Sequence, residues 1–119
     1  MATAERWNDT ELATRQGPFS LRVEHRPGEL YAIELYGELD LAGATLASEH
    51  LERATASDAR EVVIDLAGLD FIDSAGLGVL VRANAEGRGS ARLRFLRPSG
   101  AVARVITLTG LDQVLPFTD

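Results

Sequence analysis

Residues 62–80 have the sequence VVIDLAGLDFIDSAGLGVL, and this stretch decides the fold. It opens with a short, nearly continuous apolar run rich in branched side chains, which is typical of a strand covered on both faces. Asp73 or Ser74 can cap a helix that continues to about Glu86, where Gly87 ends it. The stretch therefore predicts a central strand, an acidic turn and a helix.

A hairpin and a helix are predicted before this stretch. Residues 19–25 alternate apolar and polar side chains, the period of two expected of a strand with one solvent-exposed face. Residues 30–36 form a second strand, and the short connection around Pro27 and Gly28 predicts an antiparallel hairpin. Residues 42–56 are rich in Ala, Leu and Glu with apolar residues at helical spacing, which predicts an amphipathic helix.

The remaining segments complete an α/β pattern. Residues 91–97 alternate again as a strand, residues 100–110 predict a third helix, and residues 114–117 form a short apolar tail. The order β-β-α-β-α-β-α predicts a mixed sheet of four to five strands, with an initial antiparallel hairpin and parallel strands thereafter. Because one sheet face carries polar residues, we expect the helices to pack mainly on the other face.

The chain of 119 residues fits one domain, which we place at residues 18–119. Residues 1–17 are polar and of mixed charge, with Trp7 and Leu12 as the only large apolar side chains after the first residue. So little apolar surface cannot anchor the segment strongly. We therefore expect residues 1–17 to form a mobile N-terminal arm.

Composition excludes several classes of function. Cysteine and lysine are both absent, so disulfides, thiolate metal sites, Schiff-base chemistry and a P-loop lysine are excluded. A net charge of -6 opposes binding to nucleic acid or anionic lipid, and no apolar run reaches the length of a membrane span. We expect a cytoplasmic protein without a cofactor, whose partner is a protein or a small molecule.

Polar chemistry concentrates in two segments that follow predicted parallel strands. Residues 37–43 contain Glu38 and Asp40, and residues 67–76 contain Asp70, Asp73 and Ser74. Ligands of such sheets usually meet the carboxyl ends of the strands. A hydroxyl at a helix start is placed where backbone N–H groups could hold an added phosphate, whereas the simpler interpretation is that Asp73 and Ser74 only cap the helix.

Catalytic interpretations of the same residues are weaker. Asp65, Asp70 and Asp73 could suggest a metal or acid/base site, but neither Asp65 nor Asp70 has a histidine or further carboxylate at ligand spacing. His25 and His50 are expected to be structural, and Ser74 lacks the first glycine of a hydrolase nucleophile elbow. We therefore do not expect an enzyme.

The sequence resembles a known family in three places. The strand-turn-helix of residues 62–80, with its DSAGLG motif, looks like the signature of the STAS domain in its anti-sigma factor antagonist branch. The GELD motif at residues 37–40 and the TGL motif at residues 109–111 match the family's other recurring loops. All three occur in the family's order and spacing, and the resemblance spans residues 19–117.

The resemblance implies a bacterial partner switch that regulates transcription. In that family the unphosphorylated protein binds an anti-sigma factor that is also a serine kinase, and this binding frees the sigma factor. The kinase then phosphorylates the antagonist, here at Ser74, which ends the contact, and a phosphatase acting on Ser74 would be a further partner. The family often has a second hydroxyl after the acceptor, whereas this chain has Ala75.

The expected interface borders both acidic segments, a choice that rests on the predicted geometry. Two alternatives remain open at this point: a constitutive STAS subunit of a transporter or lipid-trafficking ATPase complex, and a scaffold of a signalling assembly. We expect the exposed faces of the helices at residues 42–56 and 74–86 to contribute, with Leu77 and Val79 as apolar contacts. The expected partner-binding residues are Glu38, Asp40, Asp73, Ala75, Gly76, Leu77 and Gly78.

A basic stretch follows the second helix. It contains Arg88, Arg92, Arg94 and Arg97. Such a stretch could meet an anionic partner, but a solvated sheet face is the preferred interpretation.

Overall fold

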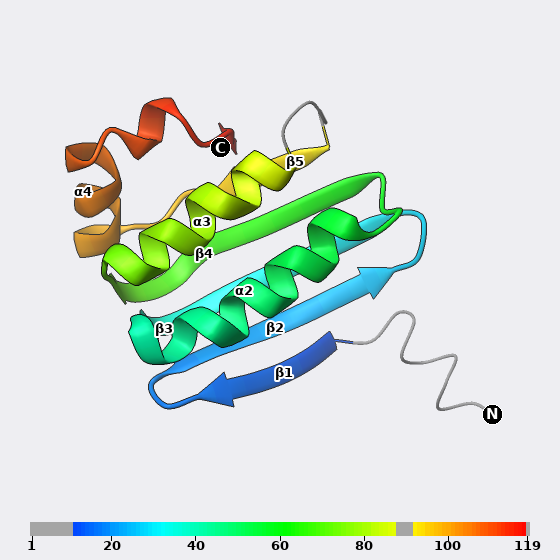
Figure 1. The fold of residues 1–119 in the computed structure, drawn as a ribbon, viewed down its shortest axis with the longest axis horizontal. Coiled ribbons are helices and arrows are strands. Elements are labelled where there is room, and N and C mark those ends of the chain that lie inside the picture. Colours follow the sequence, from blue (N-terminus) through cyan, green and yellow to red (C-terminus); the bar gives the residue numbers. More distant parts are fainter. Residues whose placement is uncertain (1–10, 88–91, 119) are drawn as a thin grey trace.

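A mixed sheet with helices on one face forms the protein (Figure 1). The computed structural model describes residues 11–87 and 92–118. Within these residues the sheet has six strands in the order β1-β2-β3-β4-β5-β6. The strands are β1 Glu11–Gln16, β2 Phe19–Arg26, β3 Leu30–Leu39, β4 Glu61–Ile72, β5 Leu93–Leu96 and β6 Phe117–Thr118. The helices are α2 Leu41–Ala56, α3 Ser74–Glu86, α4 Gly100–Leu108 and the 3-10 turn η1 Leu111–Gln113.

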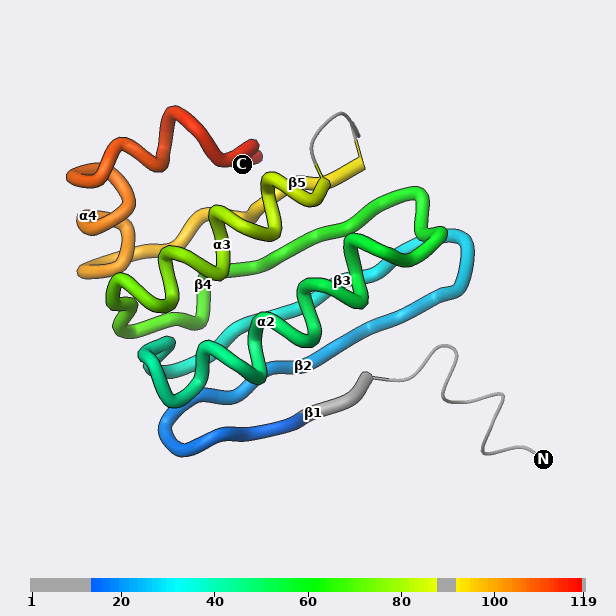
Figure 2. Tube along the Cα trace, in the orientation of Figure 1, coloured from blue at the N-terminus to red at the C-terminus, as the bar shows by residue number. Residues whose placement is uncertain are grey.

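The predicted fold class is confirmed. Strands β1, β2 and β3 pair antiparallel, whereas β3, β4, β5 and β6 pair parallel. Helices α2 and α3 lie side by side across one face of the sheet, and α4 packs against β4 (Figures 1 and 2). The core lies between this face and the helices, and its largest fully buried side chains include Phe19, Leu21, Ile33, Leu35, Leu51, Ile64, Leu66, Leu80 and Phe95.

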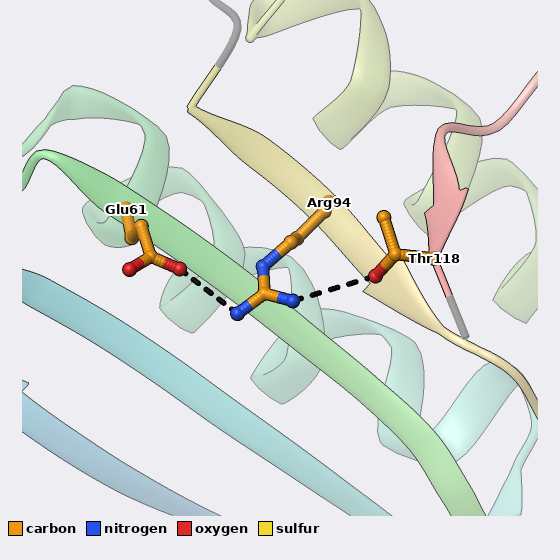
Figure 3. A network of polar contacts seen from close by, with 3 residues as sticks. All are labelled: Glu61, Arg94 and Thr118. Carbon is orange, nitrogen blue, oxygen red and sulfur yellow. Dashed lines mark hydrogen bonds and ion pairs between the residues drawn. The ribbon is translucent and has the colours of Figure 1, made fainter.

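The other face of the sheet carries charged side chains that form ion pairs and a hydroxyl that accepts from one of them. Arg94 of β5 donates to the Glu61 carboxylate at 2.9 Å and lies 3.4 Å from the Thr118 hydroxyl (Figure 3). Arg22 lies 3.6 Å from Glu34 on the neighbouring strands. These ion pairs are solvent-exposed, so each contributes less than about 1 kcal/mol to stability.

The predicted arm is wrong over its last residues, because Glu11–Gln16 forms the edge strand β1. Gln16 pairs with Phe19, so Gly17 and Pro18 form a two-residue hairpin turn. Gly17 has a φ of 60°, a conformation that glycine adopts at no steric cost. Edge pairing uses backbone groups and needs no apolar alternation, so the polar sequence did not reveal this strand. With β1 and β6, the number of strands in the described residues exceeds the predicted four to five. Residues 1–10 lie outside the described residues.

The two acidic segments are strand ends followed directly by helix starts and not loops, which corrects their predicted form. Strand β3 continues to Leu39 and β4 to Ile72, so Glu38 pairs with Phe71 across the two strand ends. The register shifts twice along this pair, between Glu34 and Tyr36 and again between Gly37 and Glu38. Such bulges tolerate glycine and polar residues that would interrupt a regular strand, and they re-aim the side chains that follow.

Arg92 is a structural cap and not part of a solvated face, which corrects the interpretation of the basic stretch. Its guanidinium donates to the carbonyl oxygens of Thr55 at 2.6 Å, Ser57 at 3.0 Å and Ala59 at 2.6 Å. These carbonyls belong to the end of α2 and the residues after it, where helical partners are missing. Arg92 thus ties the end of α2 to the start of β5. Arg88 lies outside the described residues.

Replacing Arg92 by Met should lower the free energy of unfolding by about 1–3 kcal/mol, because charge-assisted bonds to backbone carbonyls are lost. Urea denaturation followed by circular dichroism measures this loss. Arg104 is an exposed arginine on α4, so Arg104→Ala serves as the control and should change the free energy of unfolding by less than about 0.5 kcal/mol. Equal stability of the Arg92→Met variant and the wild type would contradict the capping role.

His50 lies in the core-facing side of α2, as predicted, and is only 9% exposed. Its Nδ1 is buried without a hydrogen-bond partner among the described residues. Burial lowers the pKa of His50, and the nearby Arg53 lowers it further, while Glu49 opposes the shift. The folded protein therefore favours the neutral imidazole.

This lowered pKa predicts a loss of stability on acidification. Below about pH 6.5 the unfolded chain protonates His50 more readily than the folded protein does, so the free energy of unfolding should fall as the pH drops further. In a His50→Leu variant that part of the pH dependence should disappear. Urea denaturation of both proteins between pH 7.5 and 5 gives the comparison, and parallel pH profiles would sink the assignment.

Candidate functional site

Two helix starts lie next to each other where β3 and β4 end (Figure 1). Asp40 caps α2, because its carboxylate accepts hydrogen bonds from the Ala42 N–H at 3.0 Å and the Gly43 N–H at 3.2 Å. Asp73 caps α3 and accepts from the Gly76 N–H at 3.1 Å. Of the two predicted capping candidates, Asp73 is the cap and Ser74 is the first helical residue.

A backbone contact joins these two helix starts. The Asp73 N–H donates to the Leu39 carbonyl at 3.3 Å, directly before Asp40. Leu39 also pairs with Ile72 in the strand register. As a result the sheet brings Asp40 and Ser74, which are far apart in sequence, to one end of the molecule.

The two glycines after Ser74 have different roles. A Cβ added at Gly76 would lie 2.6 Å from the Leu39 carbonyl oxygen and 2.7 Å from a side-chain carbon of Ile72. Only glycine therefore allows α3 to approach β3 this closely. A Cβ at Gly78 would have no neighbour within 4 Å, so the fold gives no reason for glycine at that position.

A groove of about 570 Å³ runs between α2 and α3, and Ser74 lies on it. Ser74 and Gly78 are exposed there, and Ala75 is half-buried. Glu49 and Glu52 of α2 and Arg82 of α3 supply the charged groups of the groove. Its remaining lining residues are Ala44, Thr45, Ser48 and Val79. Small side chains beside Ser74 leave room for the backbone of another molecule.

Most of the residues expected to bind a partner gather at this end of the sheet. Glu38 is exposed, whereas Asp40 and Asp73 are half-buried by their capping geometry. Leu77 is partly buried against the core. Val79 lines the groove but is only 5% exposed, so it offers little apolar surface to a partner.

Two exposed apolar residues at this end were missed by the sequence interpretation. Leu41, the first residue of α2, is 77% exposed, and Phe71, near the end of β4, is 47% exposed. Neither residue interrupts a predicted pattern. Leu41 lies outside the apolar stripe of the helix predicted at residues 42–56, and Phe71 has the apolar neighbour Ile72. For Leu41 the available signal was a large apolar side chain directly after the capping residue Asp40, whereas Phe71 lies two residues before the cap Asp73.

The described residues contain no group of three or more His, Asp or Glu side chains placed to hold a metal ion. No helix among them is both long and apolar enough to cross a membrane. The site therefore offers the hydroxyls of Ser74, Thr45 and Ser48, several carboxylates, the Arg82 guanidinium and exposed apolar side chains around a groove.

Comparison with known proteins agrees with this geometry. A family model described as "Mlab, STAS domain" matches residues 23–116. An anti-sigma F factor antagonist of Paenibacillus polymyxa is 27% identical over 101 residues, which is 83% of this chain and 86% of that protein. The anti-sigma-F factor antagonist RsfB of Mycobacterium tuberculosis is 28% identical over 81 residues, 68% of this chain and 66% of RsfB.

A solved structure extends the likeness to three dimensions. The crystal structure of an anti-sigma factor antagonist from Mycobacterium paratuberculosis superposes with a TM-score of 0.71 at 25% sequence identity. The match covers 92% of this chain and 86% of that one. Fold and site thus define a small α/β domain with two neighbouring helix starts and a groove at its strand ends. The chain belongs to the STAS domain family.

The contrast between the two glycines generates a stability prediction. Gly76→Ala should destabilise the fold by about 1–3 kcal/mol, because the new methyl group collides with β3. Gly78→Ala should stabilise it by about 0.5–1 kcal/mol, because alanine is the better helix former and meets no neighbour. Urea denaturation of both variants measures the change in the free energy of unfolding, which should be a decrease for Gly76→Ala and an increase for Gly78→Ala. A destabilised Gly78→Ala protein would show an intramolecular role for Gly78.

Proposed function

We propose that the protein is an anti-sigma factor antagonist controlled by phosphorylation at Ser74. The unphosphorylated form binds an anti-sigma factor that is also a serine kinase, and this frees the sigma factor in the bacterial cytoplasm. Phosphorylation of Ser74 by that kinase ends the contact. The protein is in this proposal a substrate and a binding partner, and not a catalyst.

The observation that carries the proposal is the position of Ser74. It is exposed at the first turn of α3, on the groove between α2 and α3, and directly follows the capping residue Asp73. The neighbouring Ala75 has no hydroxyl, so Ser74 is the one acceptor in this turn. A kinase docked on the groove could therefore reach Ser74 without unfolding any element.

Charge explains how the modification ends binding. A phosphoserine adds about -1.5 to -2 charges. It would lie beside Asp73, at the end of the molecule where Asp40 and Glu38 also lie. At a docked interface, one contact near 4 Å between the phosphate and a negative group of the partner costs about 4 kcal/mol at an effective dielectric of 20. Even about 2–3 kcal/mol would weaken an interface by about 30- to 150-fold, so local repulsion suffices.

The relatives support this class of function over the alternatives. The named proteins from Paenibacillus polymyxa and Mycobacterium tuberculosis are both anti-sigma factor antagonists. The superposed Mycobacterium paratuberculosis structure has the same description. A constitutive subunit of a transporter or lipid-trafficking complex is therefore not favoured.

The proposal predicts phosphorylation at one residue. We would purify each serine-kinase anti-sigma factor encoded in the same genome and incubate it with this protein and Mg-ATP. At least one kinase should add a single phosphoryl group, which fragmentation of the intact protein places at Ser74. Calorimetry should then show an affinity about 30- to 150-fold weaker for the phosphorylated form.

Two variants serve as controls. Ser74→Ala should bind the kinase but never gain the phosphoryl group. Ser48→Ala, which removes a half-buried hydroxyl from the same groove, should be phosphorylated like the wild type. Phosphorylation at another residue, or equal affinity of the two forms, would refute the switch.

A further inference from the structure

A hollow of about 150 Å³ lies on the sheet face that points away from α2 and α3. Its residues on β3 and β4 alternate with the core residues Ile33 and Ile64, which places the hollow on the opposite face of the sheet. The residues that form it include Arg22 and Glu24 of β2, Ala32 and Glu34 of β3, and Val63 and Asp65 of β4. We call this cavity the open-face hollow.

A small side chain surrounded by longer ones creates the open-face hollow. Ala32 pairs with Glu24 on one side and with Val63 on the other. Ala32 is half-buried, and Val63 is buried although it is not part of the core cluster, so the floor is apolar. Glu34 and Asp65 bring carboxylates to the rim. Such a site fits an aromatic ring that has a hydrogen-bond donor at its edge.

The strand register places the start of β1 close to this hollow. Glu11 pairs with Glu24, and Glu24 pairs with Ala32, so the three residues form one row across the sheet. Neighbouring strands are about 4.8 Å apart, which puts Ala32 about 10 Å from Glu11. Trp7, the chain's single tryptophan, precedes Glu11 by four residues. Four extended residues span up to about 13 Å, so the chain is long enough to bring Trp7 over Ala32.

We propose that the open-face hollow binds the chain's own N-terminal segment, with the indole of Trp7 over Ala32. The ring covers the apolar floor, and the indole N–H donates to a rim carboxylate of Glu34 or Asp65. A segment tethered this close is present at an effective concentration of about millimolar, which favours it over an outside molecule. One indole in a fitted hollow thus holds a segment whose composition predicted a mobile arm.

This inference does not depend on the proposed function. The groove beside Ser74 lies between α2 and α3, whereas the open-face hollow lies on the other side of the sheet. A docked N-terminal segment therefore covers the open face and leaves the groove accessible to a partner. Trp7→Ala should accordingly be phosphorylated at Ser74 like the wild type.

Nuclear magnetic resonance of the full-length protein tests the contact directly. Nuclear Overhauser effects should connect the Trp7 indole protons with the methyl groups of Ala32 and Val63. Because the chain has a single tryptophan, its fluorescence reports the same contact. Acrylamide should quench the folded protein several-fold less than the urea-unfolded protein, and the folded protein should emit at shorter wavelength. Absence of Overhauser effects to both residues would overturn the inference.

A variant that fills the hollow supplies the second test. Ala32→Gln adds a longer side chain without a charge, so it should displace Trp7, increase quenching and shift the emission to longer wavelength. Ala101→Gln makes the same change at an exposed alanine of α4 and should leave the fluorescence unchanged. Circular dichroism confirms that each variant is folded. Unchanged fluorescence of folded Ala32→Gln would contradict docking over Ala32.

A second copy of the chain is the competing occupant. In a mixture of differently labelled molecules, Overhauser effects that arise only between two copies, together with a dimer in sedimentation, would assign the hollow to self-association. That result would overturn docking of the chain's own segment. Overhauser effects within a sedimenting monomer support the proposal. They do so even if no kinase phosphorylates Ser74, so failure of the proposed function remains distinguishable from failure of this inference.

Discussion

The Leu39 carbonyl is the point on which the arrangement of this molecule depends. It accepts a hydrogen bond from the Asp73 N–H at 3.3 Å, and the bare backbone of Gly76 packs against it. A side chain at Gly76 would push α3 away from β3. Through this contact, two helix starts that belong to different crossovers become neighbours. The acidic segments, the groove and Ser74 all take their relative positions from it.

A rigid frame of this kind suits a switch that acts by charge. The start of α3 is held by the Asp73 cap and by the close approach at Gly76, so it has little freedom to respond to a phosphate by refolding. The modification would instead change the potential of a surface that already exists. Stability resides elsewhere, in the buried side chains between sheet and helices and in the Arg92 cap of α2. The side chains that stabilise the fold are thus largely separate from the exposed Ser74.

Sequence patterns predicted the elements that bury a continuous apolar face. The run at residues 62–66, the alternation at residues 19–25 and the helical spacing at residues 42–56 all correspond to observed elements. Strand β1 was missed because an edge strand is held by backbone pairing, which leaves no apolar period in the sequence. The length of β4 was underestimated because bulges let glycine and aspartate lie inside a strand. Arg92 resembled a surface residue because its three carbonyl partners are more than thirty positions away.

The sequence by itself determined the fold class and the start of a helix at Asp73 or Ser74, because these depend on local spacing and on neighbouring side chains. Only the tertiary structure decided which residues in and around the motif are buried and which are exposed. Gly76 and Val79 are used by the core, whereas Gly78, Leu41 and Phe71 are not. That division depends on how α3 docks against β3, a contact between segments far apart in the chain, and no local pattern records it.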